Sequence, residues 1–222
     1  MTELGSSTTL LHASEALFSA LWLAGLVVVW RTGPTAIRLG TYLGTTVYAF
    51  LWDWIQGQDW FFRTTFDDRL IPAFSLDGRQ EPLFAPLAYG LVFGTLAVGG
   101  LALFPWLHAR LGGWTYLVAG LVGGVLDILV EGGVAVSTLK MYVMHYDTGW
   151  KILNLPWIVP MYVALLTVGL LWVVVTLQDL VGERGRRRDP AGLWLICLVL
   201  PAGVNYLVVA GLALVFDTIK PW

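Results

Sequence analysis

Residues 114–138 read WTYLVAGLVGGVLDILVEGGVAVST, an apolar stretch that carries two acids, Asp127 and Glu131. A helix rises about 1.5 Å per residue, so this length is sufficient to cross the roughly 30 Å hydrocarbon core of a bilayer. One Asp at the centre of a spanning helix costs roughly 2.5 to 3.5 kcal/mol on insertion scales, so two acids on one helix require a use or a partner. The stretch predicts a membrane helix and marks both acids as candidate functional residues.

The whole chain has the composition of a membrane protein. Of its 222 residues 57% are hydrophobic and only 13% are charged, and the mean hydropathy is +0.73. Soluble domains carry charge on about a quarter of their residues. We therefore predict an all-α, polytopic helical bundle, built as one transmembrane domain over residues 1–222. Apolar windows predict about six spans, with a seventh left open, at 12–30, 36–56, 86–107, 114–138, 155–178 and 193–216.

Basic residues predict the orientation, because short cytoplasmic loops carry an excess of Lys and Arg. Seven of the 13 lie in three short connections, at Arg31, Arg38, Arg110, Arg184, Arg186, Arg187 and Arg188. The other six are spread over longer segments, so both termini and the aromatic loop at about 57–85 are predicted to be extracytoplasmic. This loop is expected to form a structured cap. A net charge of −2 with no basic stripe gives no reason to expect a nucleic-acid partner.

Three acids are the candidate catalytic residues. Asp127 and Glu131, four positions apart, share a helix face with Cβ atoms about 5 to 6 Å apart. Two carboxyl groups that close in a medium of low dielectric constant do not easily both ionise, so at least one is expected to hold a proton and serve as an acid. Asp53, at the end of the span 36–56, is predicted to lie at the same membrane level. Neutral acids that merely hydrogen-bond neighbouring helices are the alternative reading.

Further polar and aromatic residues converge on the same outer half of the predicted bundle. The candidates for substrate binding are Trp52, Trp54, Tyr142, His145, Tyr146, Trp157 and Asn205. Trp and Tyr also gather at membrane interfaces without any further role, which is the alternative for most of these rings.

No cofactor and no metal site are predicted. Retinal binding needs a lysine deep in a late span, whereas Lys140, Lys151 and Lys220 lie at span ends. A bis-histidine haem needs imidazoles that face each other inside the bundle, and the three histidines lie near span ends. Imidazole and carboxylate groups suit several metals, but no spacing here is diagnostic.

The segment 131–160, EGGVAVSTLKMYVMHYDTGWKILNLPWIVP, resembles part of the integral-membrane carotenoid hydratases. In that family a glutamate precedes a tyrosine-containing loop, a glycine and two prolines, and the matching positions are Glu131, Tyr142, Tyr146, Gly149, Pro156 and Pro160. In overall plan the chain also looks like the integral-membrane terpene cyclases. Both resemblances imply protonation of a carbon–carbon double bond in a lipophilic isoprenoid, followed by hydration or cyclisation. They imply a hydratase of the lyase class or a cyclase of the isomerase class.

Three hypotheses follow from the sequence. The first is an acid-initiated membrane enzyme that acts on a terpenoid or carotenoid, with membrane lipids around it. The second is a non-catalytic subunit of a larger membrane complex or oligomer, in which the aromatic loop and small-residue helix faces are docking surfaces. The third is a proton-coupled or lipid transporter that uses the same acids as relay sites.

Overall fold

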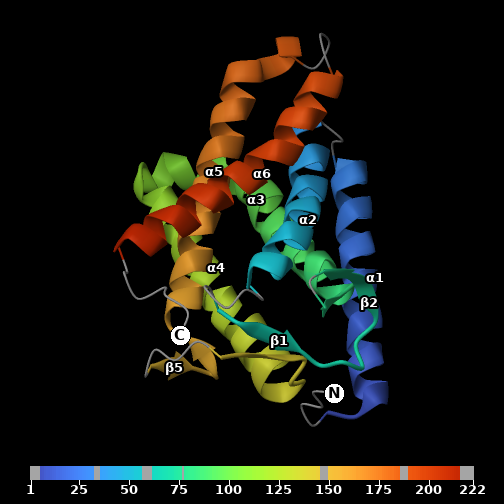
Figure 1. Ribbon diagram of the computed structural model, residues 1–222. Helices are drawn as coiled ribbons and strands as arrows, with labels where there is room; N and C mark the ends of the chain where they lie inside the picture. Colours follow the sequence, from blue (N-terminus) through green and yellow to red (C-terminus); the bar gives the residue numbers. More distant parts are fainter. Residues whose placement is uncertain are drawn as a thin grey trace.

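A computed structural model describes residues 6–32, 36–56, 62–76, 78–145, 150–185 and 190–215 (Figure 1). Within these ranges the chain is a bundle of helices. The α-helices are α1 (Thr8–Thr32), α2 (Ala36–Gln56), α3 (Phe84–Leu111), α4 (Trp114–Asp127), α5 (Ile158–Gly185) and α6 (Pro190–Val215). A π-helix, η1 (Ile128–Thr138), continues α4 without a break. The prediction of a helical bundle is confirmed. Each predicted span contains a helix, but α5 starts at Ile158 and not at residue 155.

Within the described ranges, four helical segments are long and apolar enough to cross a membrane. They are Thr8–Thr32, Phe84–Leu111, the combined helix Trp114–Thr138, and Ile158–Leu180. In α6 the apolar part that the structure describes is shorter, at Trp194–Val208. Large apolar side chains face outward on these helices, among them Leu17 and Leu21 of α1, Val125 of α4 and Leu129 of η1. Lipid chains suit such surfaces, so the fold fits a membrane protein.

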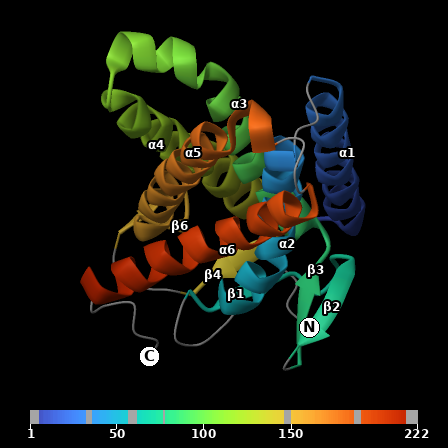
Figure 2. The same ribbon diagram turned by 90° about the horizontal axis from the view of Figure 1, so that it is seen from above.

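Glycines allow the helices to approach one another closely. A Cβ atom added at Gly90 of α3 would lie 1.9 Å from Thr46 Oγ1 of α2. One added at Gly120 of α4 would lie 3.1 Å from the Ala164 carbonyl oxygen of α5. Seen from above, α1 lies at the edge of the bundle (Figure 2). Small residues at helix interfaces are the usual packing device in membranes.

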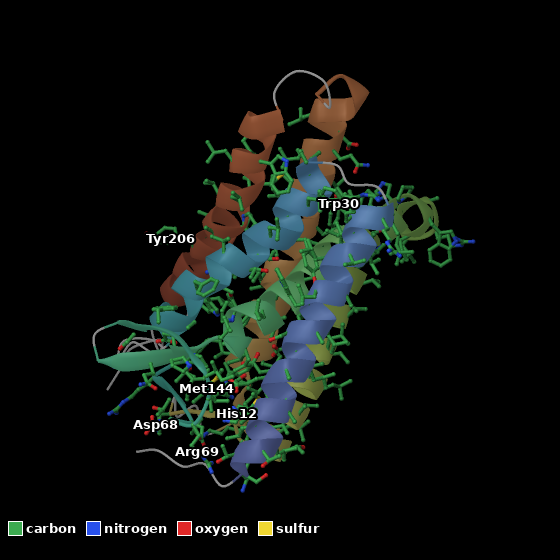
Figure 3. All side chains as sticks on the ribbon, turned by 90° about the vertical axis from the view of Figure 1, so that its right-hand side faces the viewer. His12, Trp30, Asp68, Arg69, Met144 and Tyr206 are labelled. Atoms are coloured by element: carbon green, nitrogen blue, oxygen red, sulfur yellow. The ribbon has the colours of Figure 1, made fainter. Side chains whose placement is uncertain are left out.

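Short strands build a cap at one end of the bundle. The strand β1 (Thr64–Phe66) pairs antiparallel with β4 (Tyr142–Met144), so the segments after α2 and after η1 lie on the same side. The hairpin of β2 (Pro72–Leu76) and β3 (Arg79–Pro82) and that of β5 (Lys151–Ile152) and β6 (Leu155–Pro156) complete the strands. His12, Asp68, Arg69 and Met144 gather at this end, whereas Trp30 lies at the other end of α1 (Figure 3).

Buried charged groups fasten the cap to α1 and to itself. Glu15 of α1 is buried, and its carboxylate accepts a hydrogen bond of 2.8 Å from the backbone N–H of Ile71 and lies 2.9 Å from His12 Nδ1. In the cap, the Arg69 guanidinium donates to both oxygens of Asp67, at 2.9 and 2.7 Å. Bidentate pairs of this kind fix geometry as well as charge.

Glu81 makes the stability of the cap depend on pH. Its side chain is 2% exposed and its Oε2 has no hydrogen-bond partner among the described residues. Burial raises its pKa above 4.5, partly offset by Arg79. The folded state thus favours the protonated form, and the stability from this group is lost as pH rises from 4.5 through the raised pKa.

The Glu81→Gln variant, which keeps the neutral form at all pH values, is therefore expected to gain thermal stability over the wild type as pH increases through that window. Melting curves of both proteins in detergent at a series of pH values measure the difference. A difference that does not change with pH contradicts this account.

Candidate functional site

An apolar pocket lies between α1, α3 and the α4–η1 helix, directly beneath the cap. Its cavity volume is about 50 Å³, counted as space open to the centre of a water-sized sphere, and it is partly open to the surroundings. The lining residues are Phe18, Phe66, Phe84, Ala85, Ala88, Tyr89, Val92, Phe93, Leu126, Asp127, Val130, Glu131, Ala135 and Tyr142. By this measure one water needs about 10 to 15 Å³, so the space suits a few waters or a narrow hydrocarbon segment.

Asp127 and Glu131 enter this pocket from the junction of two helix types. Asp127 is the last residue of α4, and Glu131 lies in the first turn of η1. A π-helix is rare and is often found at functional sites, because its i→i+5 hydrogen bonds widen the helix locally. The wide turns close with Leu139 N–H donating to the Val134 carbonyl at 2.8 Å. The sequence predicted one continuous helix over 114–138 but not the change from α-helix to π-helix.

Asp127 is the most deeply placed acid of the pocket. Its side chain is only 6% exposed, and its Oδ2 has no hydrogen-bond partner among the residues that the structure describes. The carboxyl group lies close enough to Glu131 for the two to interact electrostatically. A buried polar oxygen without a partner costs about 1 to 3 kcal/mol, so this oxygen is suited to meet a ligand or a water.

Glu131 is held by the cap. The Tyr142 hydroxyl donates a hydrogen bond of 2.5 Å to Glu131 Oε1. Burial, and secondly the Glu131 carboxyl, raise the pKa of Tyr142 well above its usual value, so the phenol keeps its proton and remains a donor. Tyr142 is in turn fixed by β4, where it lies opposite Phe66 in the ladder with β1. The cap thereby sets the orientation of one of the two acids.

Aromatic rings form the walls around the two acids. Phe66 contacts Tyr142 with ring centroids 5.3 Å apart and Phe84 at 6.3 Å, and Phe18 contacts Phe84 at 6.0 Å. Tyr89 and Phe93 of α3 stack at 5.6 Å. Ring faces carry negative potential, so they stabilise a cation held nearby.

The structure brings together only some of the residues that the sequence singles out. Asp127, Glu131 and Tyr142 line the pocket, and none of the other candidates with described side chains does so. Asp53 and Trp54 belong to α2, but their side chains lie outside the described residues, as does Tyr146 entirely. These positions remain candidates from the sequence alone.

The remaining candidates have contacts elsewhere in the fold. Trp52 is fully buried and stacks on Tyr162 at a centroid distance of 4.8 Å. Asn205 accepts a hydrogen bond from the Tyr162 hydroxyl, which also lies 2.9 Å from the Tyr48 hydroxyl. These hydrogen-bonded side chains connect α2, α5 and α6. Trp157 packs against the main core.

His145 is exposed and lies 3.1 Å from Thr65 Oγ1 in the cap. For these four side chains the contacts indicate packing, and a role in binding stays a prediction.

Sequence reasoning missed most of the pocket walls, at Phe18, Phe84, Tyr89 and Phe93. A usable signal was present in the first three turns of α3. Large rings recur there at Phe84, Tyr89 and Phe93, with the small residues Ala85 and Ala88 between them. Large and small side chains thus alternate along this part of the helix. In an apolar sequence, hydropathy does not distinguish such rings from lipid-facing residues.

The chain matches no family model, no curated protein and no solved structure in comparisons with known proteins. The resemblance of residues 131–160 to the carotenoid hydratases therefore stays a prediction. Of the residues that carry it, Glu131 and Tyr142 are hydrogen-bonded to each other in the pocket.

The contact between Tyr142 and Glu131 is expected to contribute measurably to stability. Changing Tyr142 to Phe leaves the partly buried Glu131 carboxyl without this donor, so the free energy of unfolding should fall by about 1 to 3 kcal/mol. Titration with sodium dodecyl sulfate in mixed micelles measures it. Tyr206→Phe is the matched control, because Tyr206 is 71% exposed on α6 and should change stability by less than about 0.5 kcal/mol. Equal effects of the two changes would argue against the contact.

Proposed function

We propose that this protein is an integral-membrane enzyme that uses the Asp127 and Glu131 pair to protonate a double bond of a lipophilic isoprenoid. The observation that carries the proposal is the pair itself, which lies in an apolar pocket walled by aromatic rings. An acid in a dry site with cation-stabilising walls is what such a reaction requires. The resemblance to the carotenoid hydratases and terpene cyclases adds the isoprenoid class.

The two acids have different surroundings, which favours different roles. Glu131 accepts a hydrogen bond from Tyr142, and a carboxylate is the better acceptor for such a bond. Asp127 is deeper and has one oxygen that is unpaired within the described residues. We assign Asp127 as the proton donor and Glu131 as the partner that balances charge when a cation forms. Environments that separate two carboxyl groups in this way are typical of acid and base pairs in enzymes.

The proposed reaction needs only the Asp127 proton and, for hydration, a water. The Asp127 proton forms a new C–H bond as the π bond breaks, which leaves a carbocation and an Asp127 carboxylate. In hydration, a water oxygen bonds to the cation and its extra proton returns to the carboxylate, so the net change is addition of water. In cyclisation, a second double bond of the same molecule attacks the cation and a neighbouring C–H proton returns to the carboxylate, so the net change is an isomerisation.

The narrow cavity limits how the substrate binds. At about 50 Å³ it accommodates one reacting segment of a long isoprenoid and not a folded whole molecule. The rest of the chain would lie along apolar outer surface, to which the pocket is partly open. Leu126, a lining residue that is 37% exposed, marks such a connection. A substrate dissolved in the bilayer could therefore enter sideways.

Lipid extraction from the gently purified protein tests the proposal, together with terpenoid profiles of cells with and without it. A retained isoprenoid, or a product that differs by one water or by rearrangement, is the expected result. Phospholipid alone, an unchanged profile and a stoichiometric protein partner would instead favour the subunit hypothesis.

We propose further that all six helices cross the membrane, with both termini and the cap on the extracytoplasmic side. The distribution of basic residues supports this orientation. After Cys197 is replaced by Ser, a membrane-impermeant maleimide added to intact cells should label Asp68→Cys in the cap and fail to label Arg110→Cys at the end of α3. Both positions are exposed in the structure, so accessibility is matched. The reverse labelling pattern would refute the orientation.

A further inference from the structure

One carboxyl oxygen of Asp127 in the pocket has no hydrogen-bond partner among the described residues. This oxygen, Oδ2, is buried, and Asp127 as a whole is only 6% exposed. In folded proteins the great majority of buried polar atoms are paired. An oxygen left open inside a pocket is therefore suited to bind a polar group of a ligand in place of a water.

Glu131 interacts with the Asp127 carboxyl group, but Oδ2 itself has no hydrogen-bond partner among the described residues. The Tyr142 hydroxyl, which lines the same pocket, donates to Glu131 Oε1 at 2.5 Å. On Asp127's own helix the lining residues besides Glu131 are Leu126, Val130 and Ala135, which have no polar side-chain atoms. Phe18 and Phe93 on the facing helices are apolar as well. The polar groups of the lining are thus those of Asp127, Glu131, Tyr89 and Tyr142, and Asp127 Oδ2 is the buried atom among them without a hydrogen-bond partner in the described residues.

We propose that the ligand of this pocket is an oxygenated isoprenoid, an alcohol or a ketone, whose oxygen forms a hydrogen bond with Asp127. The inference deepens the proposed function and rests on it for the isoprenoid class. A hydroxyl can donate to Asp127 or accept from it, and a carbonyl accepts from the protonated acid. A pure hydrocarbon would fill the aromatic part of the pocket and leave Asp127 Oδ2 unpaired, which is the costlier complex.

The hydrogen bond also defines where the reacting bond lies. With the ligand oxygen at Asp127, the adjoining carbons lie in the part of the pocket that is lined by Glu131, Phe66 and Tyr142. The segment next to the oxygen is then the part surrounded by rings. Discrimination by a site built to pair a polar group is strong, because the analogue without that group leaves the buried atom unsatisfied.

A matched pair of ligands tests the inference. Equilibrium binding of geranylgeraniol and of the hydrocarbon that lacks only its hydroxyl is measured with the full chain in nanodiscs, and binding to empty nanodiscs is subtracted. We expect the alcohol to bind about tenfold more tightly, the ratio that corresponds to one good hydrogen bond of 1.4 kcal/mol. Equal affinity of the two ligands for the wild-type protein overturns the inference without the need for any variant.

Variants at the same position assign the preference to Asp127. In Asp127→Leu, similar in size and apolar, the two ligands should bind equally, with the affinity for the hydrocarbon retained. Asp127→Asn, which still offers hydrogen-bonding atoms, should keep part of the preference for the alcohol. An undiminished preference in Asp127→Leu would contradict the assignment.

Binding and turnover are separate readouts, so the two proposals can fail independently. A preference for the alcohol without any reaction supports the ligand class and counts against the enzyme. Turnover of isoprenoids with equal binding of the alcohol and the hydrocarbon supports the enzyme and rejects the ligand class.

Discussion

Asp127→Asn should reduce turnover by a factor of about 10² to 10⁴ while the protein folds and inserts normally. This range is the usual contribution of a positioned acid to catalysis. The amide has nearly the same shape as the acid but no acidic proton to give, so the protonation step loses its donor. Product formation per mole of purified protein in nanodiscs measures the effect. Glu131→Gln should also lose turnover, since the charge that balances the cation is removed.

Asp179→Asn is the matched control for this loss. Asp179 lies exposed on α5, away from the pocket residues, so its change should leave turnover near the wild-type rate. Retained thermal stability of Asp127→Asn separates a chemical defect from misfolding. Full activity in both Asp127→Asn and Glu131→Gln would eliminate the proposed mechanism.

Gly90→Ala should be among the most destabilising single-methyl additions in the chain. Its new Cβ would lie 1.9 Å from Thr46 Oγ1, 2.8 Å from Thr46 Cβ and 3.0 Å from Thr46 Cα, so the backbones of α2 and α3 must separate. Overpacking of this kind typically costs about 1 to 3 kcal/mol. We expect a corresponding fall in the free energy of unfolding, measured by titration with sodium dodecyl sulfate in mixed micelles.

Gly99 provides the control on the same helix. A Cβ atom added there meets nothing within 4 Å, so Gly99→Ala adds no clash and should be neutral or slightly stabilising through the better helix propensity of alanine. Equal losses in the two variants would show that the cost lies in the helix itself and not in the α2–α3 contact. Because Gly90 follows Tyr89, Gly90→Ala is also expected to disturb the pocket wall.

The helices and the acid pair could be predicted from the sequence because both depend on simple spacing. Long apolar windows locate spans, and each predicted span contains a helix. Positions i and i+4 share a face, and Asp127 and Glu131 do line one pocket. The sequence placed Glu131 and Tyr142 in the same outer half of the bundle, but it did not predict the hydrogen bond between them.

The walls of the pocket could not be predicted, because helix rotation is not encoded in one apolar sequence. On a lipid-embedded helix, a ring that faces a pocket and a ring that faces lipid have the same hydropathy. Trp52 therefore looked like a wall residue and stacks on Tyr162 instead, whereas Phe18 went unnoticed and lines the pocket. The antiparallel pairing of β1 with β4 joins segments far apart in the chain, and three-residue strands leave too little pattern to reveal it.

The most direct test of the central claim is a reaction in deuterium oxide. Purified protein in nanodiscs is incubated with geranylgeraniol, squalene or lycopene, and products are analysed by mass spectrometry. Protonation of a double bond by Asp127, whose proton exchanges with solvent, predicts a hydrated or cyclised product with deuterium bound to carbon, and no such product from Asp127→Asn. A product that contains no carbon-bound deuterium, or one that Asp127→Asn forms equally well, would contradict the account.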